Sequence, residues 1–454
     1  MNEKFVETAS QAIERYFAPI SVERAAREHE FVQRRSALGG TVFLKTLVLG
    51  FIQHPHASLN QLCQICLDMG VSITPQGLDQ RINTTAVQFL KWMLERALKM
   101  WRAECHDIAQ VVDQFTAVYF QDSSVIALPE ALQDTFPGVG GNASSAAVKL
   151  QLLFDFLSGN ITHLAFVAGR KADQGYQDHL SHILPGSLLI QDLGFFNLDT
   201  LASVAKQMAF FLTRWQTQTT VCLTSALGQT IDMLTFLRSQ KEPVAEYQVE
   251  VGQRKHLACR MICVRLPSDV AAGRRRRARA DAKRRGTTPT QRTLGLLDWN
   301  VFLTNAPVEM LSLRQVLVCY SLRWQIELVF KLWKSEAALK HLRGVRQERV
   351  LCELYAKMIG IVLTHFLVAP LRFLLRAQHV EISLTKSRQI LQDCAKQISA
   401  ALGENHQHLK NELARLYRRL LRFGRKTRRR KHLSSFEKLR VANELTLCQL
   451  YPLA

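Results

Sequence analysis

The chain has 454 residues, too many for one simple core, so two or three domains are expected. With 47% hydrophobic residues, most of the chain can bury a core and fold. Its 59 Lys and Arg against 38 Asp and Glu give a formal net charge of +21, which points to a polyanionic partner, either nucleic acid or an anionic membrane surface.

The membrane alternative is disfavoured. The most apolar stretch, Met358–Leu375, contains His365, Pro370 and Arg372, so it is predicted to be a buried helix. The N-terminal segment MNEKFVETASQAIERYF has no apolar signal core. We therefore expect a cytosolic protein that faces DNA or RNA and has no membrane partner.

Residues 1–108 are predicted to form a helical N-terminal region that takes part in DNA binding. Ser58 is expected to cap a helix that Gly70 ends, and Thr74-Pro75 to start the next one. Two short helices about a tight turn resemble a helix-turn-helix. The same pattern is common in helical bundles that never touch DNA, so contact with DNA stays open here.

Residues 109–224 change character. The runs FTAVYFQD, VKLQLLFDFL and ITHLAFVAG are rich in β-branched and aromatic residues and predict three strands. Helices are expected over Ala172–Ile183 and Leu198–Trp215, and further strands at SLLIQD and TTVCLTS. This order, β-β-β-α-β-α-β, fits a mixed α/β sheet.

Residues 225–304 are predicted to be a β-rich insertion with a basic loop or short helix, GRRRRARADAKRRGTTPTQ. Residues 305–345 are assigned to the same core as residues 109–224. Residues 346–454 are predicted to form a helical basic C-terminal region, which ends with the basic run Arg425–His432.

The scattered cysteines include two close pairs, Cys63 with Cys66 and Cys259 with Cys263. Zinc needs four ligands at finger-like spacing, and both pairs lie in apolar runs. They are therefore predicted to be buried free thiols. The fourteen histidines form no HxH or HxxxH cluster near carboxylates, so no histidine metal site is expected.

A charged stripe is predicted on one helix near the end of the core. Neither Pro nor Gly occurs from Leu311 to Leu342, and at 100° per residue five polar side chains share one face. These are Tyr320, Arg323, Glu327, Lys331 and Lys334. Spacing alone favours an ordinary solvated face with ion pairs between residues four apart.

The segment YSLRWQIELVFKLWK places Tyr320, Arg323, Glu327 and Lys334 in the order Tyr, two residues, Arg, three residues, Glu, six residues, Lys. This pattern resembles the Y-R-E-K signature of the insertion-sequence-four family of bacterial transposases, and TNAP at Thr304–Pro307 is also similar to that family. The resemblance covers roughly residues 110–345. It implies an α/β fold with an RNase H-like catalytic core, a mixed five-stranded sheet with helices, and three metal-binding carboxylates.

Two-metal phosphoryl transfer needs carboxylates that converge on two Mg²⁺ ions about 3.5–4 Å apart. Asp122 ends the apolar run AVYF and Asp192 ends SLLI, and loop-like residues follow both. Their surroundings, DSSVIALP and QDLGFFN, resemble the family's first two aspartate regions. With Glu327 they are the predicted catalytic set, binding two Mg²⁺ or Mn²⁺ ions.

Other acids compete with this set. They are Asp113 before the first strand, Asp155 inside the second and Asp173 in a loop. A lone aspartate at a strand end is also a common turn former or helix cap, so that alternative stands for Asp122 and Asp192.

The remaining candidates bind DNA. Arg323 suits bidentate bonds to phosphate and Lys334 a point charge, while Tyr320 donates or stacks; Lys331 shares their face. The resemblance implies that the Tyr, Arg and Lys contact transposon-end DNA.

Trp299 either stacks on a flipped base or is a strand tryptophan of the insertion core. Four consecutive arginines of the insertion are predicted to neutralise DNA phosphates, with nuclear localisation as another interpretation of such runs. These are Arg274, Arg275, Arg276 and Arg277.

The predicted function is that of a DNA transposase. It would bind the terminal inverted repeats of an insertion sequence, cut at the element ends and join the 3′-hydroxyl to target DNA. We expect double-stranded DNA as partner, a homodimer on DNA, and a bacterial cytoplasmic protein that joins the nucleoid when bound. The alternatives are a transposase-derived DNA-binding protein without catalysis and a structure-selective nuclease on the same fold.

Overall fold

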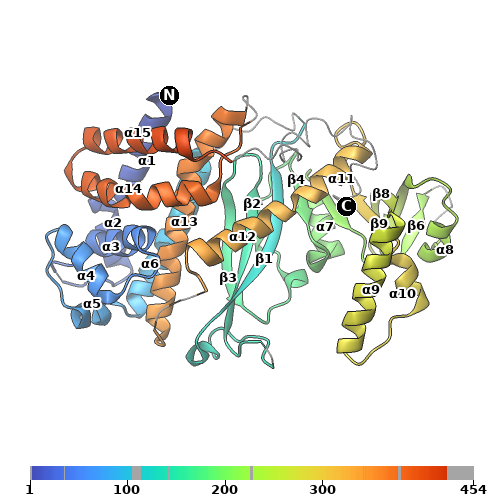
Figure 1. Ribbon diagram of the computed structural model, residues 1–454, viewed down its shortest axis with the longest axis horizontal. Helices are drawn as coiled ribbons and strands as arrows, with labels where there is room; N and C mark the ends of the chain where they lie inside the picture. The colour runs from blue at the N-terminus through green and yellow to red at the C-terminus, as the bar shows by residue number, and fades with distance from the viewer. Residues whose placement is uncertain are drawn as a thin grey trace. The chain divides into compact units, whose positions relative to one another are not determined.

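The computed structural model describes residues 3–34, 36–104, 114–141, 143–224, 229–340, 342, 344–376 and 380–426 (Figure 1). Asp113 and the basic run from residue 427 onward lie outside the described residues. The chain divides into two compact units. We call residues 1–109, 123–171 and 327–432 the helical unit, and residues 110–122, 172–326 and 433–454 the sheet unit.

The helical unit is built from both ends of the chain. Its N-terminal helices are α1 (Glu3–Phe17), α2 (Pro19–Glu28), α3 (Gly40–Gln53), α4 (Leu59–Asp68), α5 (Pro75–Arg81) and α6 (Thr84–Glu104). Its C-terminal helices are α12 (Trp324–Glu336, from Glu327 onward), α13 (Gln347–Arg376), α14 (Leu384–Glu404) and α15 (His406–Phe423). α13 packs on α3 and α6, and α15 packs on α1 and α14, so segments from the two ends share one core (Figure 1).

The predicted start and end of α4 and the predicted start of α5 are confirmed. Ser58 and Gln61 form a reciprocal capping box at the start of α4. Gly70, with φ of +79°, ends α4: its N–H bonds to Leu67 O, and the following N–H bonds back to Cys66 O. Thr74 accepts from the Gly77 N–H at 3.1 Å, with Pro75 as the first residue of α5.

α13 contains the apolar stretch that was predicted to be a buried helix. Within it, Gln347–Leu371 is long and apolar enough to cross a membrane by length and composition alone. All of its apolar window is buried inside the protein, as in the core helix of a soluble fold. Pro370 lies inside α13.

The helical unit also contains strands. β2 (Ala147–Asp155) pairs antiparallel with β3 (Ile161–Ala168), and every residue of β2 is buried. β1 (Val118–Ala127) begins in the sheet unit and ends in the helical unit, where it neighbours β2. A short 3-10 helix, Glu130–Leu132, lies between β1 and β2. The predicted succession of three strands is therefore confirmed.

The sheet unit has the strand order β1-β4-β5-β9-β8-β7-β6. β1, β4 and β5 are parallel, and the remaining pairs are antiparallel, so the sheet is mixed. Its strands are β4 (Leu188–Gln191), β5 (Phe210–Arg214), β6 (Val221–Leu223), β7 (Val244–Val251), β8 (Leu257–Arg265) and β9 (Trp299–Thr304). Its helices are α7 (Leu198–Lys206), α8 (Met233–Arg238), α9 (Ser268–Arg284), α10 (Gln291–Leu296) and α11 (Leu313–Leu322).

Two predicted helices of this unit are wrong. The first, over Ala172–Ile183, is two 3-10 segments, Asp173–Gly175 and Asp178–His182. The second, over Leu198–Trp215, is α7 followed by β5. α7 ends at a left-handed Met208 with φ of +57°, where helix-closing bonds join Met208 N to Ala205 O and Ala209 N to Val204 O. No glycine marks this stop in the sequence.

The strands β7, β8 and β9 lie within residues 225–304, and the basic stretch forms α9, a helix of 17 residues that is longer than the loop or short helix expected there. β9 pairs antiparallel with β5 from Leu212↔Thr304 to Arg214↔Phe302, so the insertion strands extend the sheet of β1, β4 and β5. The cysteines of β8, Cys259 and Cys263, are buried. Cys66 is buried and Cys63 half-buried.

The continuous helix predicted from Leu311 to Leu342 is also wrong. It is two helices, α11 and α12, which are interrupted at Arg323. At the break, the Arg323 N–H bonds to Tyr320 O and the Ile326 N–H bonds to Arg323 O, both over three residues instead of four. The angle of 100° per residue therefore does not carry from Tyr320 to Glu327.

Candidate active site

Asp122 and Asp192 occupy equivalent places on adjacent parallel strands of the sheet unit. The pairing of β1 with β4 extends to Gln121↔Gln191, and Asp122 and Asp192 directly follow these two glutamines. Because neighbouring strands lie about 4.8 Å apart, their side chains emerge side by side. The predicted strand end at Asp122 is wrong, however, since β1 continues through the β-branched residues beyond it to Ala127.

A glutamine precedes each aspartate, and both glutamines are buried. Gln191 Nε2 donates to Phe195 O at 3.2 Å, and Gln121 Nε2 lies 3.2 Å from His179 Nδ1. These bonds attach the paired strands to the segments that follow β4 and precede it. The sequence signal for this pair is the repeated Gln-Asp at the end of two apolar runs.

Arg323 lies between the two carboxylates. Its Nη1 is 3.9 Å from Asp122 Oδ2 and its Nε is 3.9 Å from Asp192 Oδ1, distances of ion pairs rather than hydrogen bonds. The side chains of Arg323 and Asp122 are each 17% exposed, and that of Asp192 is 44% exposed. The two acids thus face a common position that already accommodates positive charge.

Tyr320 supports the same site from α11. Its hydroxyl donates to Asp192 Oδ1 at 3.3 Å, and its ring packs 5.0 Å from that of Phe302. Burial first, and then the negative charge of Asp192, raise the pKa of the Tyr320 phenol well above its usual range. The phenol therefore stays protonated and remains a donor at neutral pH.

The other predicted residues of the stripe lie on α12 in the helical unit. Glu327 is exposed in the first turn of α12, where the helix dipole favours a negative charge. Lys331 is exposed and Lys334 half-buried, at intervals of four and seven residues from Glu327, which keeps all three on one face. The buried residues of α12 include Val329 and Trp333 on its other side.

The competing acids have other surroundings. Asp155 is 9% exposed and closes the turn after β2: its carboxylate accepts from the Leu157 N–H at 3.0 Å and from the Ser158 hydroxyl at 2.6 Å. Asp173 begins a 3-10 helix and is half-buried. Asp155 thus forms the turn that a lone aspartate is often used for.

The donor set of the site is made of carboxylate oxygens, which suit hard cations such as Mg²⁺ or Mn²⁺. Among the described residues, no group of three or more His, Cys, Asp or Glu lies close enough together to form a metal cluster. The pair Asp122 and Asp192, facing one guanidinium, fits a divalent cation by its chemistry and by its demand for positive charge.

Trp299 begins β9 and is only 5% exposed. The Arg265 guanidinium lies over its ring, 4.7 Å from the centroid. A ring covered in this way must be uncovered before a base can stack on it. This burial favours the second interpretation of Trp299, a tryptophan of the insertion core.

The four consecutive arginines of α9 divide into two kinds. Arg274 Nη1 donates to Asn300 Oδ1 at 2.8 Å, and Arg275 forms an ion pair with Asp298. Arg276 and Arg277 are exposed. The first two attach α9 to the start of β9, and the last two face solvent.

Two positioning residues were missed by the sequence analysis. The Asn305 amide, within the segment TNAP, accepts from the Phe211 N–H at 2.7 Å and donates to Ala209 O at 3.0 Å, which fixes the end of β9 against β5. Arg260 is 4% exposed and donates to Ala306 O and Leu311 O, at 2.6 and 2.9 Å. It holds the segment that leads into α11. An arginine within the apolar run of β8 was the available signal.

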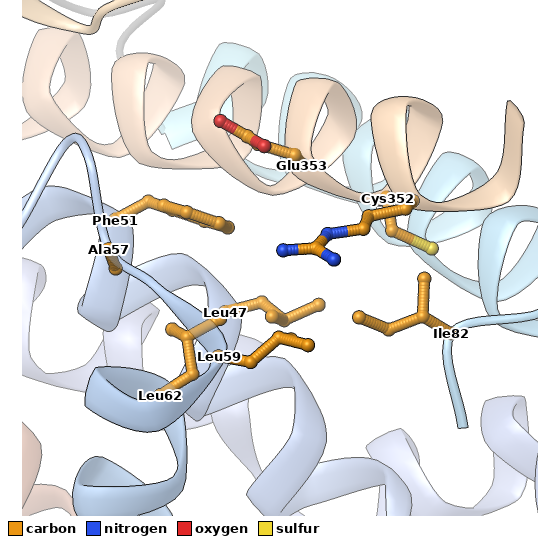
Figure 2. Close-up of a pocket in the computed structure, with 9 residues that line it drawn as sticks. Leu47, Phe51, Ala57, Leu59, Leu62, Ile82, Cys352 and Glu353 are labelled. Carbon is orange, nitrogen blue, oxygen red and sulfur yellow. The ribbon is translucent and has the colours of Figure 1, made fainter. Parts of the chain in front are cut away.

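A separate pocket lies in the helical unit, between α3, α4 and α13 (Figure 2). Most of its lining is aliphatic, and Figure 2 shows Leu47, Leu59 and Leu62 facing Cys352 across it. The acid at its edge, Glu353, forms an ion pair with Lys357 at 2.6 Å. A lining of this kind offers no catalytic set, so the candidate active site remains with Asp122 and Asp192.

Residues 113–363 match the family model described as "Transposase DDE domain". The chain is 28% identical to the transposase for insertion sequence element IS231F of Bacillus thuringiensis subsp. israelensis, over 96% of each chain. It is 25% identical to the transposase for insertion sequence element IS1151 of Clostridium perfringens, over 97% of each. A piggyBac transposase synaptic complex with hairpin DNA overlaps 90% of this chain and 85% of its own, with a TM-score of 0.45 and 9% identity.

Proposed function

Because the chain belongs to the family of DDE-domain transposases, we propose that it moves an insertion sequence by cutting DNA at the element ends and joining the freed 3′-hydroxyls to target DNA. The observation that carries this proposal is the side-by-side placement of Asp122 and Asp192 on β1 and β4, with Arg323 between them. Two carboxylates that share a cation position are what phosphoryl transfer with divalent metals requires.

Asp122, Asp192 and Glu327 would hold two Mg²⁺ or Mn²⁺ ions. Bound metal supplies an activated water or 3′-hydroxyl nucleophile and neutralises charge on the leaving oxygen. The support for Asp122 and Asp192 is their register, whereas that for Glu327 is the spacing of the Y-R-E-K segment. The strands present the two aspartates from rigid backbone, so little reorganisation is needed when metal binds.

The neighbouring side chains would handle the DNA. Arg323 can turn from the two carboxylates to a phosphate, for which its planar donors are suited. Tyr320 keeps its proton and orients Asp192 through a hydrogen bond. Lys331 and Lys334 would bind phosphates on either side of the cut as point charges.

We infer membership of the insertion-sequence-four group from the Y-R-E-K spacing, and an RNase H-like core from strands β1 to β5, which the strands of the insertion extend. The proposed domains are a DNA-binding N-terminal region (1–108), a catalytic core (109–224 and 305–345), an insertion (225–304) and a basic C-terminal region (346–454). The partners would be terminal inverted repeats and target DNA, bound by a homodimer in the bacterial cytoplasm.

A cleavage assay tests the proposal. The substrate is a supercoiled plasmid that carries the gene with its natural flanking DNA, incubated with the full chain and Mg²⁺, and nicks are mapped by primer extension. We expect nicks at two symmetric positions outside the gene, and none in EDTA. Asp122→Asn, Asp192→Asn and Glu327→Gln should reduce cleavage to background, while the exposed-carboxyl controls Asp269→Asn and Glu309→Gln should keep it.

Several outcomes would contradict the proposal. Cleavage that survives Glu327→Gln would remove this residue from the catalytic set. Binding to the element ends without any cleavage would favour the catalytically inactive DNA-binding protein. Cleavage of four-way junctions without preference for the element ends would favour the structure-selective nuclease.

A further inference from the structure

We propose that one face of α9 is a binding surface for the phosphate backbone of duplex DNA, and that only part of its arginine run serves this purpose. The surface consists of Arg276, Arg279 and Lys283, which we call the α9 stripe. At 100° per residue these three lie within about 60° of one another, and all are exposed. The inference rests on the proposed function, because it takes duplex DNA as the partner.

The helix is attached to its unit by different arginines. Arg274 bonds to Asn300 and Arg275 pairs with Asp298, and these two partners flank Trp299 at the start of β9. Relative to Arg276, Arg274 points about 160° away around the helix. Arg275 lies about 40° from Arg279 around the helix and so borders the stripe, but its guanidinium is paired with Asp298. The two anchoring arginines therefore differ from the stripe in having partners within the protein.

The charges of the stripe are not compensated within the protein. Among the residues that the structure describes, none of Arg276, Arg279 and Lys283 has an ion-pair partner. Asp281, which lies between Arg279 and Lys283 in the sequence, pairs with Arg284. Like charges three and four residues apart destabilise a helix. A solvated helix that serves only structure would alternate the signs of its charges, whereas this one gains stability when a polyanion covers it.

The dimensions suit a duplex. α9 runs unbroken to Arg284, and Gly286, with φ of +68°, follows the end of the helix just beyond the stripe. At 1.5 Å per residue, Arg276 to Lys283 spans about 10 Å. A DNA strand carries a phosphate about every 3.4 Å along its axis, so the stripe can reach about three phosphates. Gly273 and Ala280, on the same side, add no bulk to hinder approach.

The test measures the salt dependence of binding by the full chain. A fluorescein-labelled duplex of mixed sequence is titrated at several salt concentrations, and the slope of log Kd against log salt is compared. The triple variant Arg276→Gln/Arg279→Gln/Lys283→Gln should lower the slope by about 2.7, at about 0.9 per phosphate contact. It should weaken binding to the element ends and to the mixed duplex by the same factor, because phosphate contacts carry no sequence information.

The matched control is Lys206→Gln/Lys241→Gln/Arg254→Gln, which removes three exposed cations of the same unit that are not part of α9. Its slope should stay close to that of the wild type. A stripe variant whose slope equals that of this control would overturn the inference. So would a variant that keeps the slope on DNA but loses binding to phosphatidylserine vesicles, since the stripe would then serve a membrane.

The two proposals fail separately. If the wild type does not cleave the plasmid but the stripe variant loses salt dependence, the surface stands and the transposase chemistry falls. If the wild type cleaves and the stripe variant keeps its slope, only the α9 surface falls. Asp122→Asn removes a proposed metal ligand and leaves α9 intact. When the triple stripe variant is made in this Asp122→Asn background, it should lower the slope by as much as it does in the wild type.

Discussion

Arg323 lies within ion-pair distance of both Asp122 and Asp192. In the absence of metal its guanidinium balances two carboxylates that would otherwise repel each other. Arg323→Ala is expected to lower the free energy of unfolding at neutral pH by about 1–2 kcal/mol, between the values of exposed and buried ion pairs. It should also slow cleavage about 10²–10³-fold, because a fixed positive group near the reacting phosphate is lost. Chemical denaturation and the plasmid assay measure the two effects.

Arg323→Lys is the informative control. A lysine keeps the charge but cannot form two parallel bonds to a phosphate. It should therefore restore stability more fully than it restores cleavage. Equal stability of the Ala and Lys variants would show that the ion pairs contribute nothing to folding, and full cleavage by the Ala variant would exclude Arg323 from the reaction.

For single residues, the sequence predicted which side chains belong to the candidate site but not which distant side chains they contact. The two Gln-Asp pairs at the ends of apolar runs identify Asp122 and Asp192, and the register of β1 with β4 brings them together. The sequence could not separate Arg274 and Arg275 from the arginines that follow them. Their partners, Asn300 and Asp298, lie more than twenty residues further along the chain, and only tertiary packing brings them close.

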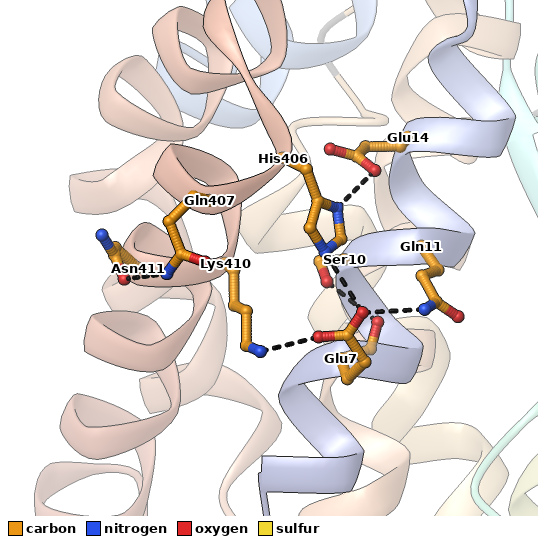
Figure 3. Close-up of polar contacts among 8 residues, drawn as sticks. All are labelled: Glu7, Ser10, Gln11, Glu14, His406, Gln407, Lys410 and Asn411. Atoms are coloured by element: carbon orange, nitrogen blue, oxygen red, sulfur yellow. Dashed lines mark hydrogen bonds and ion pairs between the residues drawn. The ribbon is translucent and has the colours of Figure 1, made fainter.

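The helices α1 and α15 are joined by a cluster of ionisable groups (Figure 3). His406 Nδ1 lies 2.7 Å from Glu14 Oε2 and His406 Nε2 lies 3.2 Å from Glu7 Oε1, while Lys410 Nζ pairs with Glu7 Oε2 at 2.8 Å. Hydrogen bonding to Glu14 is the largest cause that raises the pKa of His406 above its usual value near 6.5. The imidazolium form uses both nitrogens as donors.

The packing of α15 on α1 is therefore expected to depend on pH. A histidine with a raised folded-state pKa contributes stability that is fully present below about pH 6.5 and is lost as pH rises through the raised value. Amide hydrogen exchange of α15, corrected for the intrinsic rate, should show lower protection on the alkaline side. His406→Gln should remove this pH dependence. The exposed-histidine control His54→Gln should keep it, and a variant at 406 with an unchanged profile would contradict the assignment.

Helix ends could be predicted where local side chains define them. Ser58 and Gly70 mark both ends of α4, and the structure confirms both. The ends at Met208 and Arg323 carry no such residue. A left-handed methionine and a break without Pro or Gly lie outside what local propensity indicates, so the sequence gives no signal for them.

For the molecule as a whole, DNA binding and DNA cleavage are expected to respond differently to metal removal. The net charge of +21 is spread over the chain and attracts DNA without any metal. The carboxylates, in contrast, need divalent cations to act on a phosphate. EDTA should therefore reduce cleavage to background while duplex binding persists, as measured by the plasmid assay and by fluorescence anisotropy in parallel.

Added Mg²⁺ or Mn²⁺ should restore cleavage, and Ca²⁺ serves as the comparison cation. Binding is expected to weaken somewhat when Mg²⁺ is added, because divalent ions compete as counterions for the DNA. Cleavage that persists in EDTA would contradict the proposed chemistry. Loss of binding in EDTA would show that metal is needed for DNA association as well.

The sequence by itself indicated a polyanionic partner through its net charge and many of the strands through their β-branched and aromatic residues, and the spacing of its Y-R-E-K segment carried the resemblance to a transposase family. Tertiary structure alone decided that β9 pairs with β5, that α11 and α12 separate at Arg323, and that Arg323 faces both Asp122 and Asp192. Strand partners and ion pairs depend on contacts between residues distant along the chain. Such contacts are selected by burial and by hydrogen-bond satisfaction over the whole fold, which no local pattern contains.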